Sequence, residues 1–222
     1  MGFVTQGVPK ELVLRLASKP AQMSFVETGT YYGTTASWAA QHFRKIITIE
    51  VDPEISRETA KRLQTTPNIE FLVGNSGALL PQVIEKLGEP ALFWLDGHYS
   101  GPGTGGEGFE CPLMDELAAL TKAKDPIILI DDARCFLGPP PPPHKPEQWP
   151  RIDEIFAYLA KNFPHHVTTV CDDVIISVPA HVKPALDQEW LDHFEARFPT
   201  PPPPPPPTVL DRIKRRLTRG RA

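Results

Sequence analysis

Apolar and polar positions alternate between two patterns along the chain. Short runs rich in β-branched and aromatic residues are followed by segments in which apolar residues recur every three or four positions. This alternation is typical of βαβ units that build a parallel sheet. We expect strands at 24–28, 45–52, 68–74, 91–97, 126–132, 166–170 and 174–178. We expect helices at 10–16, 34–43, 53–64, 78–87, 111–121 and 151–163.

Two of the strand segments, LFWL and IILI, are continuously apolar, which indicates strands that helices cover on both faces. The last two strand segments are separated only by Cys-Asp-Asp and predict a closing hairpin. The predicted fold class is therefore α/β, a doubly wound, mostly parallel seven-stranded sheet with a C-terminal antiparallel hairpin. Residues 1–199 are predicted to form one domain, 200–207 a polyproline linker and 208–222 a basic tail.

Composition changes this picture in one respect, the distribution of charge and proline. Hydrophobic residues make up 41% of the chain and charged residues 23%, as in ordinary globular proteins. Many of the 27 prolines lie in two runs, Pro139–Pro143 and Pro201–Pro207. The net charge is −4, although the segment from Thr200 holds six basic residues and one acidic residue. The body is therefore acidic, which argues against a nucleic-acid partner because phosphate binding needs a basic face.

The tail leaves two interpretations open. The sequence VLDRIKRRL has apolar residues on one helical face and basic residues on the other, as in a short amphipathic helix that contacts an anionic membrane or a partner protein. The alternative is a solvated, disordered tail.

Cellular location is predicted from cysteines and apolar runs. Three cysteines without CxxC spacing favour a reducing compartment. No signal peptide is recognisable, and no run of 18 apolar residues predicts a transmembrane helix. We therefore expect a cytoplasmic protein.

The segment FVETGTYYGTTA, residues 25–36, follows the first strand and opens a helix. Gly29 and Gly33 let the backbone approach a ligand closely, but the middle glycine of a dinucleotide-binding G-x-G-x-x-G is missing. Glu50 ends the next strand, where an acid in doubly wound folds accepts hydrogen bonds from ribose hydroxyls. A glycine pair of this kind also occurs in turns of other α/β proteins.

These residues resemble the motifs of the class I S-adenosylmethionine-dependent methyltransferases. Their first motif, acid-x-Gly-x-x-x-Gly, is matched by Glu27, Gly29 and Gly33. The turn Gly74-Asn75-Ser76 is similar to their adenine-contacting turn, although Asp is more usual at the position of Asn75. The resemblance implies a Rossmann-like methyltransferase sheet and S-adenosylmethionine as the cofactor. The implied cofactor-binding residues are Glu27, Gly29, Thr30, Gly33, Glu50, Asn75, Ser76 and Asp96.

Three carboxylates are predicted to meet at the sheet edge where ligands bind in open α/β folds. Asp96 ends the fourth strand, and Asp131 and Asp132 end the fifth, which we expect to be its neighbour. Like charges so close are unfavourable unless a positive group joins them, and Mg²⁺ or another divalent cation with oxygen ligands would do so. The alternative for Asp131 and Asp132 is a loop start, with one acid capping a turn and the other solvated.

This pattern is similar to that of the metal-dependent, macrocin-type sugar O-methyltransferases. Asp96-Gly97 and Asp131-Asp132 match the acids that hold the metal in that branch. The glycine-rich segment 98–110 departs from the pattern, so a different substrate is expected. The five glycines within 100–108 predict a mobile lid.

The resemblance implies metal-assisted O-methylation of a small hydroxylated acceptor, of sugar or natural-product type. His98 is the candidate base, and its alternative roles are a hydrogen bond to loop backbone or support of a metal ligand. Two other functions stay open: a metal-independent methyltransferase, or a non-catalytic nucleotide-binding module in a glycan or natural-product pathway.

The loop after the fifth strand leaves its own alternatives. Arg134, His144 and Lys145 either bind an acidic substrate or are solvated. Pro139–Pro143 is either a rigid wall beside the acceptor or an exposed docking segment.

Overall fold

The structure, a computed structural model, describes residues 7–198. Residues 1–6 and 199–222 lie outside the described residues, and the predicted linker and basic tail fall among them. Residues 7–189 form one compact unit, and residues 190–198 belong to a second.

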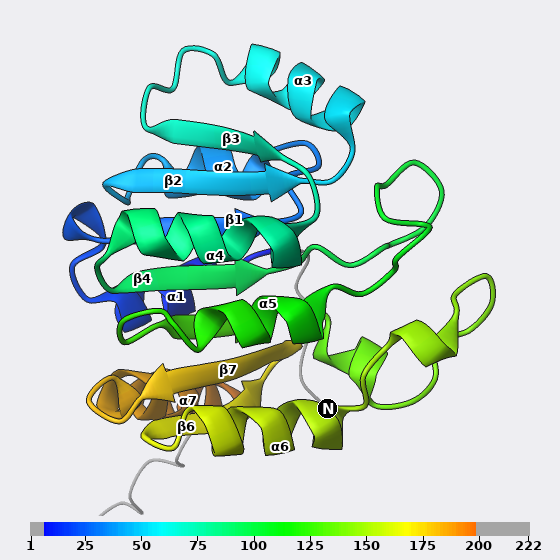
Figure 1. The fold of residues 1–222 in the computed structure, drawn as a ribbon. Helices are drawn as coiled ribbons and strands as arrows, with labels where there is room; N and C mark the ends of the chain where they lie inside the picture. The colour runs from blue at the N-terminus through cyan, green and yellow to red at the C-terminus, as the bar shows by residue number, and fades with distance from the viewer. Residues whose placement is uncertain (1–6, 199–222) are drawn as a thin grey trace, which may run out of the picture. The chain divides into compact units, whose positions relative to one another are not determined.

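The main unit is built on a seven-stranded sheet with the order β3-β2-β1-β4-β5-β7-β6 (Figure 1). All neighbouring strands are parallel except β7, which is antiparallel to both β5 and β6. The predicted mostly parallel sheet with an antiparallel hairpin is therefore confirmed. The strands are β1 Ser24–Thr28, β2 Lys45–Glu50, β3 Ile69–Val73, β4 Ala91–Leu95, β5 Ile127–Ile130, β6 His166–Cys171 and β7 Val174–Pro179.

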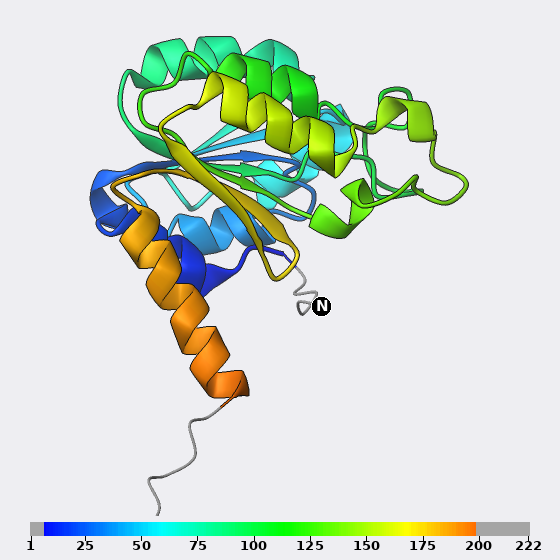
Figure 2. The same ribbon diagram turned by 90° about the horizontal axis from the view of Figure 1, so that it is seen from below.

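Helices cover both faces of the sheet, as the continuously apolar strands indicated. Figure 2 shows α4, α5 and α6 on one face and α1 and α2 on the other. The helices are α1 Lys10–Ala17, α2 Thr34–Ala39, α3 Pro53–Arg62, α4 Ser76–Leu87, α5 Leu113–Leu120, α6 Ile152–Asn162 and α7 Lys183–Arg197. Within the described residues, none of these helices is long and apolar enough to cross a membrane.

Alternate residues of the central strands enter two separate cores. Val26 and Phe93 pack with α4, α5 and α6, whereas their neighbours Phe25 and Trp94 pack with α1 and α2. This follows from the two-residue period of a strand, which sends successive side chains to opposite faces. The sheet is thus fixed from both sides, and its loops at the carboxyl ends are free to form a site.

The helix α7 was not predicted. Of its residues only Leu186 and Glu189 are buried, so no apolar stripe marks it in the sequence. Glu189 forms an ion pair with Arg15, and its Oε2 lies 2.7 Å from Arg15 Nε. In the second unit the rings of Trp190 and Phe194 stack with centroids 5.2 Å apart, and both side chains are exposed.

Candidate functional site

A cavity of about 900 Å³ lies at the carboxyl ends of the parallel strands. Its walls are the turns that follow β1, β2, β3, β4 and β5, together with the glycine-rich loop. The predicted site residues that line it are Gly29, Glu50, Asn75, Ser76, Asp96, His98, Asp131 and Asp132. Three other predicted cofactor residues, Glu27, Thr30 and Gly33, are buried and are not part of its lining. The structure thus brings together most of the residues predicted from separate motifs.

Gly29 holds the turn after β1 against the turn after β4. Its φ is +83°, a conformation that residues with a side chain rarely adopt. A Cβ atom at this position would lie 2.2 Å from the carbonyl oxygen of Asp96. Only glycine fits, so the first motif and the backbone of Asp96 lie directly against each other at the cavity.

Glu50 is buried at the end of β2 and is oriented by backbone donors. The backbone N–H of Tyr31 donates to Oε2 at 2.9 Å, and that of Asp52 donates to Oε1 at 3.1 Å. The glycine-rich loop reaches this carboxylate, because a Cβ on Gly105 would lie 3.0 Å from Oε1 and 2.5 Å from Val51 Cγ1. The loop therefore forms a wall directly over the predicted ribose-binding acid.

Glu27 lies beneath the cavity in a buried chain of hydroxyl groups. The Thr48 hydroxyl donates to Glu27 Oε2 at 2.7 Å, and the hydroxyls of Thr48 and Thr30 lie 2.6 Å apart. Burial raises the pKa of Glu27 from its ordinary value of 4.5 to about 8, although the Thr48 hydrogen bond acts in the opposite direction. Glu27 is therefore a neutral acid at neutral pH.

The turn after β3 contacts a buried acid of α5, Glu116, that the sequence did not reveal. Asn75 caps α4 by accepting a hydrogen bond from the backbone N–H of Ala78 at 3.1 Å. The Ser76 hydroxyl donates to Oε1 of the buried Glu116 at 2.5 Å. Burial raises the pKa of Glu116. In the sequence Glu116 has the spacing of an ordinary helix residue, and nothing distinguishes it from a solvated one.

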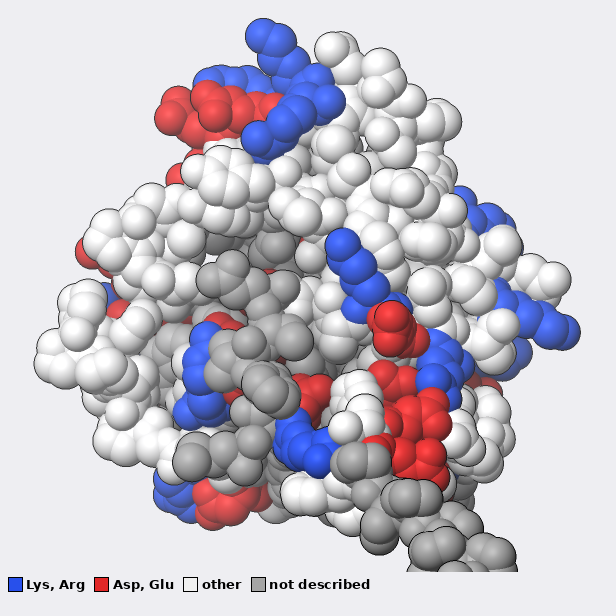
Figure 3. Space-filling view, turned by 180° about the vertical axis from the view of Figure 1, so that it is seen from behind, with Lys and Arg blue, Asp and Glu red and all other residues white. Residues whose placement is uncertain are grey.

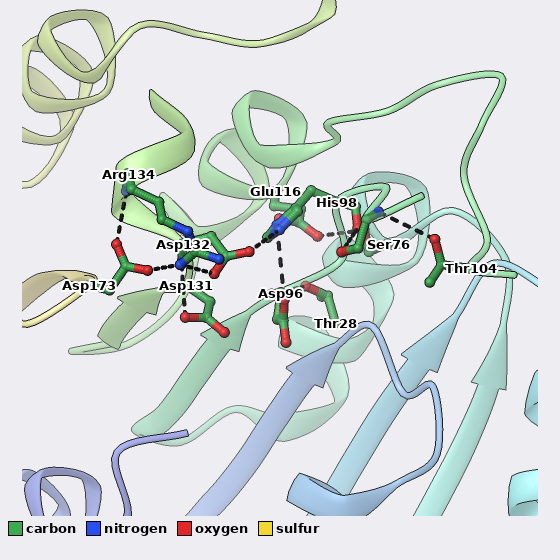
Figure 4. Close-up of polar contacts among 11 residues, drawn as sticks. Thr28, Ser76, Asp96, His98, Thr104, Glu116, Asp131, Asp132, Arg134 and Asp173 are labelled. Carbon is green, nitrogen blue, oxygen red and sulfur yellow. Dashed lines mark hydrogen bonds and ion pairs between the residues drawn. The ribbon is translucent and has the colours of Figure 1, made fainter. Parts of the chain in front are cut away.

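Asp96 and Asp132, which follow β4 and β5, lie on either side of His98, as Figure 4 shows. His98 Nε2 lies 2.9 Å from Asp132 Oδ2, and Nδ1 lies 3.9 Å from Asp96 Oδ1. The Asp131 carboxylate accepts the backbone N–H of Asp132 at 2.8 Å. Asp132 has a φ of +54°, which turns it away from the line of the strand. The predicted adjacency of the two strand ends is confirmed.

A second cation, Arg134, completes the network around Asp132 (Figure 4). Its Nη1 lies 2.6 Å from Asp132 Oδ1 and also forms an ion pair with Asp173. Asp173 further accepts the backbone N–H of Arg134 at 3.0 Å. It lies in the turn between β6 and β7, and because β7 is antiparallel to β5, this turn meets the carboxyl end of β5. The predicted hairpin could have placed Asp173 here.

The pKa values of the three acids respond differently to His98 and Arg134. Burial alone would raise the pKa of Asp132, but His98 and Arg134 lower it below the ordinary value. Burial raises the pKa of Asp96 to about 7 and that of Asp131 to about 6, and the neighbouring carboxylates contribute. Burial alone would lower the pKa of His98, but Asp132 and Asp96 raise it above its ordinary value. An acid thus lies beside each ring nitrogen of His98, and both acids favour the protonated form of the ring.

These residues fit a divalent cation by their chemistry, since carboxylate oxygens are the ligands that Mg²⁺ prefers. Their arrangement fits less closely, because His98 and Arg134 occupy both oxygens of Asp132. Among residues 7–198, the ligand atoms of Asp96, Asp131 and Asp132 do not all lie within 4.8 Å of one another. The metal site stays a prediction.

Surface charge bears on the predicted lack of a nucleic-acid partner. On the face seen in Figure 3, some described Lys and Arg side chains lie next to Asp and Glu, and others at the right-hand rim lie among uncharged residues. The lack of a nucleic-acid partner stays a prediction.

Comparisons with known proteins identify the fold. No protein-family model matches the chain, and no curated protein matches it. A Staphylococcus aureus crystal structure, provisionally assigned as a caffeoyl-CoA O-methyltransferase, aligns with 80% of this chain and 86% of its own, with a TM-score of 0.58 and 14% identity. The N-methyltransferase NodS from Bradyrhizobium japonicum aligns with 77% and 93%, with a TM-score of 0.48 and 13% identity.

A precorrin-6y C5,15-methyltransferase from Geobacter metallireducens aligns with 80% of this chain and 93% of its own, with a TM-score of 0.48 and 10% identity. The likeness to the Staphylococcus aureus structure, together with the strand order, shows that the chain has the Rossmann-like methyltransferase fold. At 14% identity the likeness concerns the fold alone.

Replacing Gly29 by Ala is expected to destabilise the protein by about 1–3 kcal/mol, because a left-handed backbone and a contact with the Asp96 carbonyl oppose the new methyl group. Urea unfolding measures this change. Gly103→Ala is the matched control, since Gly103 also has a positive φ (+91°) but nothing within 4 Å of the new Cβ. Equal losses in the two variants would contradict the close approach at Gly29.

Replacing Glu27 by Gln is expected to change how stability depends on pH. The raised pKa of Glu27 means that the folded state holds the proton more tightly than the unfolded state. The free energy of unfolding of the wild type should therefore fall, relative to Glu27→Gln, as the pH rises from about 4.5 to about 8. Urea unfolding at pH 5 and pH 8.5 without ligand measures the difference, and parallel pH profiles would refute it.

Proposed function

We propose that this protein is an S-adenosylmethionine-dependent methyltransferase that methylates an oxygen of a small hydroxylated acceptor, with a divalent cation at the carboxylate cluster. The observation that carries the proposal is that one cavity contains both Glu50, beside the Gly29 turn, and the acids that end β4 and β5. In this fold the first set suits a nucleoside and the second a reacting hydroxyl.

The chain's residues would bind the cofactor in two places. Glu50 already accepts two backbone hydrogen bonds, and its carboxylate retains acceptor capacity for ribose hydroxyls. Asn75 and Ser76 line the cavity one strand further along, where the adenine would lie. Asp96 lies between these residues and the β5 acids, at the place for the methionine portion.

S-adenosylmethionine, when bound, supplies a methyl group on a positively charged sulfur. In the transfer an acceptor oxygen forms a bond to the methyl carbon, the carbon–sulfur bond pair stays on sulfur, and the hydroxyl proton leaves. The cavity residues contribute by holding the two reactants in line and excluding water, which accounts for much of the rate in transfers of this kind.

Asp96, Asp131 and Asp132 would hold the cation, which would supply a Lewis acid that lowers the pKa of a bound hydroxyl. A metal-independent reaction is the second candidate. It is favoured by the ion pairs of Asp132, since His98 and Arg134 already compensate that charge without a metal. In that case Asp96 and Asp131 would contact the acceptor directly.

The role of His98 as the base stays a prediction. Both of its ring nitrogens face carboxylates, which favour the protonated ring, and a protonated ring cannot accept a further proton. The geometry favours the alternative role, in which His98 orients Asp132. The proton of the acceptor would then leave through another group or to water.

Glu50→Gln should weaken S-adenosylmethionine binding by about tenfold or more, because hydrogen bonds from the ribose to a charged acceptor are lost. Isothermal titration calorimetry measures the affinity. Glu54→Gln is the matched control, since Glu54 lies four residues away with 78% of its side chain exposed and should bind normally. An unchanged affinity in Glu50→Gln would remove Glu50 from the cofactor site.

Chelation separates the two candidate mechanisms. If a cation assists, EDTA should reduce the formation of S-adenosylhomocysteine with sugar, phenol or diol acceptors by at least about 100-fold, and excess Mg²⁺ should restore it. Asp131→Asn should lower the activity in the presence of Mg²⁺. Full activity in EDTA would exclude metal assistance and leave the metal-independent reaction.

A further inference from the structure

A second cavity, of about 520 Å³, lies next to the first and is built by two loops. One is the glycine-rich loop after β4, and the other is the proline-rich segment between β5 and α6. The cavities share four lining residues, namely His98, Ser100, Asp132 and Arg134. A compound in the second cavity would therefore lie next to the acids that line the first cavity.

Flat, apolar groups form most of the second cavity's wall. Pro139–Pro141 line one part, and Tyr99, Trp149 and His144 line another. The His144 ring meets the Tyr99 and Trp149 rings edge to face, with centroids 5.8 and 5.6 Å apart. Ring faces and stiff proline rings are surfaces on which another ring packs well. The structure thus favours the wall interpretation of the first proline run.

The buried carboxylate of Glu110 holds these walls together. Its Oε2 accepts hydrogen bonds from Trp149 Nε1 at 2.8 Å and from the backbone N–H of Lys145 at 3.0 Å. The Glu110 backbone N–H donates to Gln148 Oε1 at 2.8 Å, and its carbonyl accepts from the Tyr99 backbone at 2.7 Å. One residue of the glycine-rich loop therefore fixes the proline-rich segment, so specific hydrogen bonds hold the walls of the cavity in place.

The same carboxylate selects which nitrogen of the His144 ring carries a proton. His144 Nδ1 lies 3.3 Å from Glu110 Oε2. Burial alone would raise the pKa of Glu110, but the hydrogen bonds from Trp149, Lys145 and His144 lower it, so Glu110 is ionised and can only accept. Nδ1 must carry the proton. In the neutral ring Nε2 then holds a lone pair, and among residues 7–198 no partner of Nε2 is found.

Every charged group around the second cavity already has a protein partner. Arg134 pairs with Asp132 and Asp173, and Asp132 also pairs with His98. An anionic ligand would have to compete with Asp132 and Asp173 for Arg134, and a cationic ligand with His98 and Arg134 for Asp132. A neutral ring that carries hydroxyl groups has no such requirement.

We infer that the second cavity is the acceptor subsite, that it takes a neutral hydroxylated ring packed between the proline wall and Trp149, and that His144 Nε2 accepts a hydrogen bond from a ring hydroxyl. This inference rests on the proposed methyl transfer, for which it names the substrate class. Another hydroxyl of the same ring would lie at the shared boundary beside His98 and Asp132. His144 is then a specificity-determining residue, distinct from the groups that bind the cofactor.

Binding of defined probes to the full chain tests the inference. Saturation-transfer NMR titrations would use catechol and methyl β-D-glucopyranoside as neutral rings. Protocatechuate and glucose 6-phosphate are their anionic counterparts. All four are titrated into wild type saturated with S-adenosylhomocysteine. We expect at least one neutral probe to bind, and its anionic counterpart to bind at least about tenfold more weakly, because every cation in the wall is already paired.

Two variants of His144 separate recognition from folding. His144→Asn keeps an amide donor for Glu110 and removes the Nε2 acceptor, whereas His144→Phe keeps the ring and removes both nitrogens. Each should weaken the neutral probe about three- to tenfold, as the loss of one hydrogen bond predicts, and leave S-adenosylhomocysteine affinity unchanged. His165→Phe is the control, because His165 is exposed and precedes β6 at the other edge of the sheet.

Three results would overturn the inference: tighter binding of the anionic probes, unchanged neutral-probe binding in His144→Asn, or no probe binding to a protein that binds S-adenosylhomocysteine. Failure of wild type to bind S-adenosylhomocysteine is a different outcome, since it refutes the proposed function. The probe titrations are then repeated on the free protein, where loss of binding in His144→Asn still supports the ring subsite and unchanged binding refutes it.

Discussion

The constraint on which this site depends is the gathering of carboxylates at the ends of β4 and β5. Parallel neighbours end at one edge, so Asp96, Asp131 and Asp132 share a partly buried region whatever the loops do. Burial there favours the uncharged form of each acid, and mutual repulsion adds to that effect. The structure resolves the conflict unequally, because His98 and Arg134 both compensate Asp132, while Asp96 and Asp131 keep raised pKa values.

This unequal compensation explains how the loops are placed. His98 starts the glycine-rich loop and Arg134 the proline-rich segment, so each loop leaves the sheet tethered to Asp132. Farther out, Glu110 joins the same two loops through Trp149 and Lys145. The carboxylates of Asp132 and Glu110 therefore fix the two loops at two separate points and define the space between them. The second cavity results from these two sets of polar contacts rather than from apolar packing.

Much of this arrangement could be predicted from the sequence. The period-two and period-3.6 patterns predicted the sheet, and a strand end is a position that the pattern identifies well, which is why Asp96, Asp131 and Glu50 were found. Residues that act through tertiary contacts carry no such signal. Glu110 and Glu116 are acids in a loop and a helix whose burial depends on the fold around them. The helix α7 was missed because its buried positions include a glutamate and its aromatic residues are exposed.

The opposite backbone properties of the two loops have a consequence for binding. Glycine gives the loop over Glu50 many accessible conformations, and Gly105 allows its backbone to touch that acid. Proline restricts the facing segment to few conformations, so its wall loses little entropy when a ring packs on it. In the proposed function, the cofactor side can thus adapt to a long, flexible nucleoside, while the other side stays shaped for the one rigid ring of the proposed acceptor. His98 lines both cavities, and its ring centroid lies 5.4 Å from that of Trp149. It is therefore the residue at which the glycine-rich loop and the proline-rich segment meet.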